Sequence, residues 1–168
     1  MKKLAVLFFA VLAIGFTFLA NAPSASAKAA PDEALVGINT GDATIYGLAK
    51  EKPLFLNFWA TWCPPCCAEI PYLDTLAKQF AGNQDVRIIS ISVDQDREAW
   101  IKKVSEDKPA WEQYRISSED ADDFFSTIEL ETIPRFIIVA PDGSIIDEDA
   151  PRPSDESCVA TLQQAIAQ

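Results

Sequence analysis

A nearly continuous apolar run at residues 53–59 leads within a few residues into two cysteines that two prolines separate. The run has one polar residue, Asn57, and its length and composition predict a central strand that is buried on both faces. Beyond the cysteines, residues 66–80 carry apolar side chains at i, i+3 and i+4 spacing, which predicts an amphipathic helix with a kink at Pro71. This strand, cysteine pair and helix constrain the fold more than any other part of the chain.

In the rest of the chain, predicted strands and helices follow one another in an order that completes a layered sheet. Residues 86–93 predict a second buried strand, and residues 136–140 and 144–146 flank a Pro-Asp-Gly turn that predicts a hairpin. A parallel strand pair joined by a helix and extended by a hairpin indicates an α/β fold, a central mixed β-sheet with helices on both faces. Further strands are expected at 35–38, 43–46 and 111–116, and helices at 96–106 and at 118–130 after a cap at Ser117. A last helix is expected from Ser154 onwards, because Ser154 suits a helix cap and the acids Asp155 and Glu156 suit a helix N-terminus.

Residues 1–27 have the layout of a secretory signal peptide. Lys2 and Lys3 precede an uncharged stretch at 4–20, and Ala25-Ser26-Ala27 offers the small residues of a cleavage site. Cleavage there leaves one domain, residues 28–168, in the periplasm or cell envelope, where disulfides persist. The alternative is an uncleaved segment in which residues 4–20 anchor the protein to the membrane.

The composition excludes several kinds of site. The 168 residues include four cysteines but no histidine, which excludes a Ser-His-Asp triad, a Cys-His protease, a His-ligated metal and a c-type haem site. The formal net charge of −11 argues against nucleic acid or anionic lipid as a partner, since both favour Lys and Arg. We expect neither a cofactor nor a bound metal.

Cys63 and Cys66 lie at the expected first turn of the helix, where their sulfurs can close a small disulfide ring. Free N–H groups and the positive end of the helix dipole stabilise a thiolate at Cys63, and a thiolate is the attacking species in disulfide exchange. Pro64 and Pro65 suit the first helical positions and stiffen the ring. The pattern predicts a redox pair; a structural disulfide, half of a four-cysteine zinc site and two inert buried thiols are the alternatives.

Residues 56–66, with the sequence LNFWATWCPPC, and the Glu-Ile-Pro that follows at 69–71 resemble the thioredoxin superfamily. More narrowly, they resemble its exported TlpA/ResA-type thiol–disulfide oxidoreductases, from residue 37 to the C-terminus. Residues 132–134 match the cis-proline loop of that fold, and residues 94–131 match the insertion of this branch. The resemblance implies a thioredoxin-like fold with an N-terminal strand extension.

The resemblance also implies which residues receive a client protein. The backbone of Ile133, before a cis Pro134, pairs with an extended client strand, and main-chain hydrogen bonds supply the affinity. Trp62 provides an apolar platform beside the site. A trans proline at the start of an edge strand is the alternative for Pro134. The candidate substrate-binding residues are Trp62, Pro64, Ile133 and Pro134.

Two polar positions near the cysteines are informative. In the resembled branch an acid at the position of Glu69 lies near the buried cysteine, here Cys66, and assists its proton transfer. A carboxyl in an apolar pocket has a raised pKa, which suits that role, whereas an ordinary solvated glutamate is the alternative. Asn57 departs from ordinary thioredoxin, which has a buried acid at the matching strand position, and this departure increases the interest of Glu69. The candidate catalytic residues are Cys63, Cys66 and Glu69.

Cys67 and Cys158 are not part of the C-x-x-C pair. The resembled branch commonly has a basic or polar residue at position 67. Because the last helix and the active-site helix share a face of the sheet in this fold, a Cys67–Cys158 disulfide is one interpretation. The others are two free thiols, or a Cys67 that competes with Cys66 for Cys63 after the first helical turn unwinds.

The sequence as a whole predicts an exported thiol–disulfide oxidoreductase that exchanges its Cys63–Cys66 pair with protein thiols and disulfides. The resemblance implies the reducing direction, a membrane-embedded electron donor, and clients such as apocytochromes or other envelope proteins. One alternative is a peroxiredoxin-like peroxide reductase, although that enzyme requires a T-x-x-C context that Thr61 does not provide. A Cu(I)-binding chaperone that uses the cysteines is the other.

Overall fold

The computed structural model describes residues 28–167 except 31–33, 39, 51, 82–85 and 117–120. The signal peptide prediction and the expected cap at Ser117 therefore lie outside the described residues. In chain order the elements are β1 (Leu35–Gly37), α1 (Ile45–Ala49), β2 (Leu54–Trp59), α2 (Pro64–Phe80), β3 (Arg87–Ser92), α3 (Arg97–Asp107), β4 (Glu112–Ile116), α4 (Ala121–Ile128), β5 (Arg135–Val139), β6 (Ile145–Asp147) and α5 (Cys158–Ile166).

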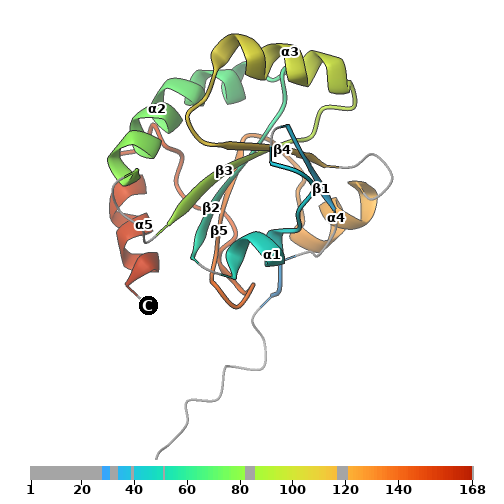
Figure 1. The fold of residues 1–168 in the computed structure, drawn as a ribbon. Helices are drawn as coiled ribbons and strands as arrows, with labels where there is room; N and C mark the ends of the chain where they lie inside the picture. The colour runs from blue at the N-terminus through green and yellow to red at the C-terminus, as the bar shows by residue number, and fades with distance from the viewer. Residues whose placement is uncertain are drawn as a thin grey trace, which may run out of the picture.

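The strands form one six-stranded sheet in the order β1-β4-β3-β2-β5-β6. The β2–β3 and β3–β4 pairs are parallel, whereas β1–β4, β2–β5 and β5–β6 are antiparallel. Helices cover both faces of the sheet, with α2, α3 and α5 on one side and α1 and α4 on the other (Figure 1). The predicted mixed sheet, its N-terminal strand and the insertion of α3, β4 and α4 between β3 and the proline loop are confirmed.

Alternation along β2 explains how both faces are filled, because successive side chains of a strand point to opposite sides. Leu54, Leu56 and Phe58 pack into a core that includes α1 and α4. Phe55 packs on the other face against α2 and α5, and Trp59 packs there against α3. All six residues of β2 are buried, as expected for a central strand covered on both sides.

The prediction of a strand at residues 43–46 is wrong. Ala43 makes only an isolated bridge with Leu35, and the chain then enters α1. Thr44 caps this helix, since its Oγ1 accepts a hydrogen bond from the backbone N–H of Gly47 at 3.0 Å. The predicted strand stops at residue 46, but the apolar pattern continues beyond it with i, i+3 and i+4 spacing, which is typical of a helix. The side chains on this face of α1 are buried: Ile45, Leu48 and Ala49.

The C-terminal hairpin follows its turn signal. Gly143 has φ of +84°, a left-handed conformation that glycine adopts without steric cost. The backbone N–H of Ala140 donates to the carbonyl O of Ser144 at 2.8 Å, which closes the turn between β5 and β6. β5 lies directly beside β2, so the proline loop that precedes β5 is held next to the segment that leads from β2 into α2.

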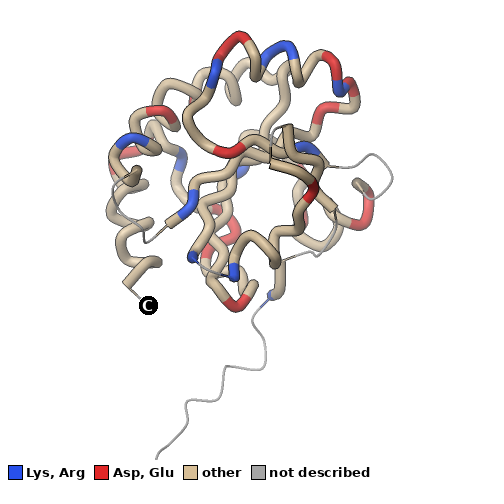
Figure 2. Tube along the Cα trace, viewed as in Figure 1, with Lys and Arg blue, Asp and Glu red and all other residues tan. Residues whose placement is uncertain are grey.

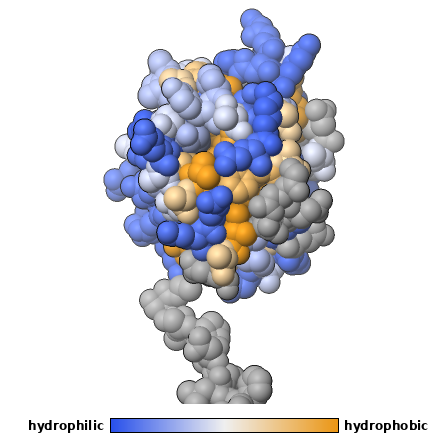
Figure 3. Space-filling model, turned by 90° about the vertical axis from the view of Figure 1, so that its left-hand side faces the viewer, coloured by the Kyte–Doolittle hydropathy of each residue, from blue (hydrophilic) through white to orange (hydrophobic). Residues whose placement is uncertain are grey.

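The surface is largely polar. Acidic and basic residues are interspersed along α3 (Figure 2), where Lys103 pairs with Asp107 at 2.5 Å. The side of the molecule on which α2 and α5 lie is mostly hydrophilic, with a narrow band of apolar residues (Figure 3). Large exposed hydrophobic side chains among the described residues are Tyr46, Trp62 and Tyr72. In the part of the chain that the structure describes, no helix has the length and apolarity that a membrane crossing requires.

Candidate active site

Cys63 and Cys66 form a disulfide at the start of α2, where the sequence predicts a redox pair. Cys63 is the N-cap residue of the helix, and its Sγ accepts a hydrogen bond from the backbone N–H of Cys66 at 3.2 Å. Pro64 and Pro65 begin the helix, where a missing N–H removes no intrahelical hydrogen bond. The local sequence thus places both sulfurs on the first helical turn.

The start of α2 suits an anionic sulfur. The helix has 17 residues and no acid in its first turn, so the partial positive charge at its N-terminus acts on Cys63 without a competing carboxylate in that turn. Cys63 is 5% exposed and Cys66 is 2% exposed. Cys63 is also flanked by the exposed residues Trp62 and Pro64. Of the two sulfurs, that of Cys63 is therefore better placed to meet a client.

The loop before β5 lies against the cysteines. The Ile133–Pro134 peptide bond is cis, as predicted, and the carbonyl O of Ile133 is 4.0 Å from Sγ of Cys63. Trp62, 65% exposed, stands beside this loop. Together with residues of α4 and the segment after it, Trp62 lines a groove of about 160 Å³, whose other lining residues are Val93, Phe125, Leu130, Glu131, Thr132 and Ile133. The structure thus brings Trp62, Pro64, Ile133 and Pro134 to one end of the sheet around Cys63.

Glu69 lies on α2 one turn after Cys66 and is buried, so it is not a solvated helix glutamate. Ser154 donates to both carboxylate oxygens, from its backbone N–H to Oε2 at 3.0 Å and from its hydroxyl to Oε1 at 2.8 Å. The prediction that Ser154 caps the last helix is therefore wrong. Its two donors are bonded to Glu69, and α5 begins only at Cys158.

Asn57 belongs to a neutral hydrogen-bonded cluster in the core. Its Nδ2 donates to Oγ of Ser90 at 2.9 Å, and Nε1 of Trp111 donates to the same oxygen at 2.8 Å. The position that carries an acid in ordinary thioredoxin is thus filled by an amide with a buried partner. Near the cysteine pair, the buried carboxylates are those of Glu69 and Asp94 instead.

Cys67 and Cys158 are free thiols, and the second disulfide that the sequence allowed is not formed. Cys67 is half-buried, with its Sγ 3.8 Å from the carbonyl O of Thr61. Cys158 is buried in the core between the sheet, α2 and α5. Burial, together with the negative charges of Asp155 and Glu69, raises the pKa of the Cys158 thiol to about 11.

Sequence reasoning missed Asp94, which follows β3 and is 3% exposed. Its carboxylate accepts hydrogen bonds from the backbone N–H of Thr61 at 3.0 Å and from the Thr61 hydroxyl at 2.7 Å. A signal was available, because an acid directly after a buried parallel strand lies at the same sheet edge as the segment after the neighbouring strand. That neighbouring segment contains the cysteines.

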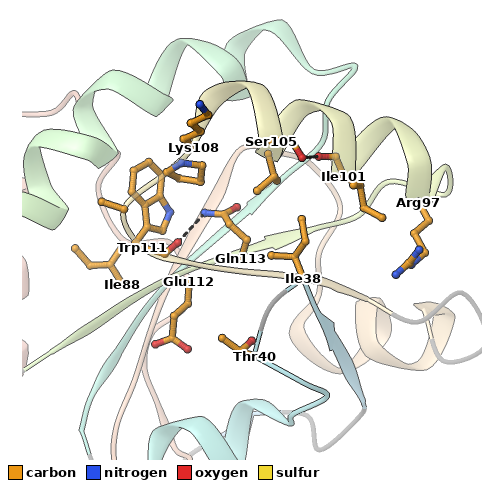
Figure 4. A pocket seen from close by; sticks show the side chains of 13 residues that line it. Ile38, Thr40, Ile88, Arg97, Ile101, Ser105, Lys108, Trp111, Glu112 and Gln113 are labelled. Atoms are coloured by element: carbon orange, nitrogen blue, oxygen red, sulfur yellow. Dashed lines mark hydrogen bonds between the residues drawn. The ribbon is translucent and has the colours of Figure 1, made fainter.

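A spacious cavity lies away from the disulfide. It measures about 810 Å³ and extends between α3 and β4 (Figure 4). Arg97 and Lys108 stand at its opposite ends, with Trp111 and Ile101 along its walls (Figure 4). Neither cysteine of the redox pair lines it, nor does the Ile133–Pro134 loop, so its size does not make it the reactive site.

Comparisons with known proteins agree with the geometry of the cysteine pair. Residues 51–145 match the thioredoxin-like family model, which is more than half of the chain. The chain is 25% identical over 175 residues to the thiol-disulfide oxidoreductase ResA of Bacillus cereus, covering 98% of each chain.

Two solved structures are similar over most of the chain. One is a thiol-disulfide oxidoreductase from Bacteroides fragilis, with a TM-score of 0.67, 25% identity, and coverage of 82% of this chain and 98% of that one. The thioredoxin domain of a Bacteroides vulgatus oxidoreductase has a TM-score of 0.73 at 24% identity, with coverage of 85% and 99%, and supports the fold. With its C-x-x-C disulfide at the start of α2, the chain belongs to the thioredoxin-like family and is a thiol-disulfide oxidoreductase.

Proposed function

We propose that Cys63 is the attacking residue and Cys66 the resolving residue of a disulfide reductase for protein clients. The Cys63 thiolate attacks one sulfur of a client disulfide, the client S–S bond breaks, and the departing client sulfur takes a proton. The deprotonated Cys66 then attacks Sγ of Cys63, which releases the second client thiol. Two electrons pass to the client, and the Cys63–Cys66 pair is left oxidised. The observation that carries this proposal is the N-cap position of Cys63 beside the Ile133–Pro134 loop.

The client binds along the proline loop. The backbone of Ile133 pairs with an extended client segment, so that the client sulfur lies next to Sγ of Cys63. Pro134 holds this backbone at the start of β5, while Trp62 and Pro64 form the walls that the client meets first. The apolar side chains of the adjoining groove, Phe125 and Leu130, receive an apolar client residue near the cysteine.

Glu69 moves the proton of Cys66. It lies one turn further along α2 and is buried, with Ser154 fixing both of its oxygens. A carboxylate in such a position accepts the thiol proton when Cys66 attacks the mixed disulfide. Replacement by glutamine keeps the shape but removes the base, so Glu69→Gln slows client release more than it slows mixed-disulfide formation.

The protein is exported, by a signal peptide at residues 1–27 or with residues 4–20 as a membrane anchor, and works in the periplasm or cell envelope. Its clients there are apocytochromes or misoxidised envelope proteins, and a membrane-embedded donor returns two electrons to the Cys63–Cys66 disulfide after each cycle. ResA, the name of the Bacillus cereus relative, belongs to the branch that the sequence resembles, and this supports the assignment.

Reduction of insulin disulfides in the presence of dithiothreitol tests the proposal. We expect the wild-type protein to accelerate the reaction, Cys63→Ser to abolish the acceleration, and Cys66→Ser to accumulate a mixed disulfide that is visible by mass spectrometry. The reduction potential of the pair tests the direction: a value below about −230 mV fits a reductant, and one near about −120 mV an oxidant. Retained turnover in Cys63→Ser contradicts the mechanism.

A further inference from the structure

Asp94 is a buried acid whose carboxylate is fully engaged at the active-site end of the sheet. Besides the two hydrogen bonds from Thr61, it accepts one from the hydroxyl of Ser92 at 2.7 Å. The hydroxyl of Ser92 in turn accepts a hydrogen bond from the backbone N–H of Asp94 at 3.0 Å. Burying a charge is costly unless hydrogen bonds replace its hydration, and here they do so with Thr61 as the main donor.

Thr61 is the middle of the segment that Asp94 holds. It lies between the end of β2 and the Trp62-Cys63 pair, and the backbone N–H of Cys63 donates to the carbonyl O of Ala60 at 3.2 Å across it. Because Asp94 binds both the backbone N–H and the hydroxyl of Thr61, it fixes the peptide direction as well as the side chain. The next residue along this turn is Trp62, which is exposed and is therefore not held by core packing.

Asp94 is itself supported from the insertion. The guanidinium of Arg115 donates from Nη1 to the carbonyl O of Asp94 at 3.1 Å. Arg115 lies on β4 and is buried, and β4 pairs with β3 next to Asp94. A chain of hydrogen bonds thus connects the inserted strand to the turn before Cys63.

Trp62 separates two grooves at this end of the molecule. One is the apolar groove along the proline loop, and the other, of about 570 Å³, lies between the turn and the start of α3. Residues 61, 62 and 93–96 line the second groove together with Ala99. The indole of Trp62 is therefore a wall of both grooves, and its position depends on the turn that Asp94 holds.

We propose that Asp94 is a positioning residue that fixes the Thr61-Trp62 turn and thereby lets a polypeptide client, in contrast to a small disulfide or dithiol, fit against Cys63. This inference rests on the proposed function. Small misplacements of a group that positions the substrate cost about 100-fold in rate. A small dithiol does not span the grooves, so its reaction with the Cys63–Cys66 disulfide does not depend on where Trp62 stands.

The test compares two rates in each variant: kcat/KM for insulin, and the rate at which dithiothreitol reduces the Cys63–Cys66 disulfide. Asp94→Ala lowers the first about 10- to 100-fold and changes the second by less than about threefold. Asp94→Asn restores most of the insulin rate, because Oδ1 accepts a hydrogen bond from the Thr61 hydroxyl and also lies 3.2 Å from the Thr61 N–H, while the amide nitrogen takes the place of Oδ2 beside Ser92. Thr61→Val, which keeps the shape but loses the hydroxyl, falls between the two.

Ser90→Ala is the matched control. It removes a buried hydroxyl from β3, the strand that Asp94 follows, and with it the hydrogen bonds from Asn57 and Trp111. The turn before Cys63 stays intact. The ratio of the two rates stays at the wild-type value in this variant. If it falls as far as in Asp94→Ala, the effect is a general loss of core packing and the inference is overturned.

Two further outcomes overturn the inference. One is a folded Asp94→Ala protein with the wild-type ratio of the two rates. The other is an Asp94→Asn protein as impaired as Asp94→Ala, because the loss of insulin reduction is then due to the missing charge and not to the missing hydrogen bonds to Thr61. If Asp94→Ala does not fold, an unchanged ratio in Thr61→Val decides against it. Failure of the proposed function has a different signature, since wild-type protein then reduces no insulin and Cys66→Ser traps no client.

Discussion

Helices α2 and α5 each begin at a cysteine, Cys63 and Cys158, and the surroundings of the two sulfurs make their reactivity differ. Cys63 is the N-cap of α2, and neither α2 nor α5 has an acid in its first turn. Cys158 is the first residue of α5, whose cap residue Ser157 makes no side-chain hydrogen bond to the helix. Only the first of these cysteines is paired in a disulfide; the second is a free thiol whose pKa is raised to about 11.

The contrast shows which effect prevails at a helix start. The helix dipole favours a thiolate at both positions and is worth about 0.3–1 kcal/mol on exposed groups. At Cys158 burial opposes ionisation, and so do the carboxylates of Asp155 and Glu69. Burial and neighbouring charge therefore outweigh the dipole at Cys158. Because neither helix has an acid in its first turn, the charges that act on Cys158 come from outside that turn, from Asp155 before α5 and from Glu69 on α2.

Alkylation of the reduced protein at pH 7 gives the largest expected difference. A thiol with a pKa of about 11 is ionised in about one molecule in ten thousand at this pH, and Cys158 is also shielded from the reagent. We expect Cys63 to react with iodoacetamide more than about a hundredfold faster than Cys158. Peptide mass spectrometry over time measures both rates.

Urea provides the control for that experiment, since unfolding exposes both cysteines and removes the helix starts. The two alkylation rates then converge to within about threefold. Equal rates in the folded protein contradict the account of both helices.

The pH dependence of stability gives the next largest effect. The thiol of Cys158 keeps its proton up to about pH 11 when folded, but loses it near its usual pKa of 9.0 when unfolded. Between these values the unfolded state binds fewer protons, so the free energy of unfolding falls as pH rises. The stabilisation is fully present below about pH 9, and the loss reaches about 3 kcal/mol, at 1.36 kcal/mol per pKa unit.

Cys158→Ala isolates this contribution from the other groups that titrate in alkali. Urea unfolding of oxidised wild type and variant is measured from pH 8 to 11. The variant is less stable at pH 8, because it loses buried volume, but its stability declines less steeply above pH 9. Parallel curves for the two proteins rule out a raised pKa at Cys158.

The same contrast shows how far the sequence alone reaches. The strand, C-x-x-C pair and helix were predictable because each depends on local pattern, and the cis Pro134 followed from resemblance to a family. Ser154 was misread as a helix cap, since the acids after it are typical of a helix start. Its actual partner, Glu69, is 85 residues away in sequence. Such a pair is set by how α5 packs on α2, which no local pattern contains.

Asp94 was missed for a similar reason. Its role depends on the register of β2 and β3, in which Trp59 lies opposite Ser92. Thr61 and Asp94 each lie two residues further along the chain, and this register brings them together. The two central strands were predicted, but their register was not. Residue 94 entered the sequence interpretation only as the start of an insertion.

Asp155→Asn tests how much of the contrast depends on charge. Asp155 is one of the two acids that raise the pKa of Cys158, and its carboxylate accepts two hydrogen bonds from Ser157, which an amide oxygen can also accept. The substitution removes the charge and keeps the turn. We expect the alkylation rate of Cys158 at pH 9 to rise about two- to threefold, since an exposed charge acts through a high effective dielectric. If the rate is unchanged, the raised pKa of Cys158 results from burial and Glu69 alone.

The smallest effect is expected at Cys67, which lies on the first turns of α2 but is neither the N-cap nor deeply buried. Its thiol makes a weak hydrogen bond to the carbonyl O of Thr61, at 3.8 Å. Cys67→Ala therefore changes the free energy of unfolding by less than about 0.5 kcal/mol and the insulin reduction rate by less than about twofold. Cys67→Ser, which keeps a donor near that carbonyl, serves as the comparison. A larger loss of insulin reduction in both variants shows that the Cys67 thiol takes part in the exchange at Cys63, whereas a loss in the alanine variant alone is due to the missing hydrogen bond to Thr61.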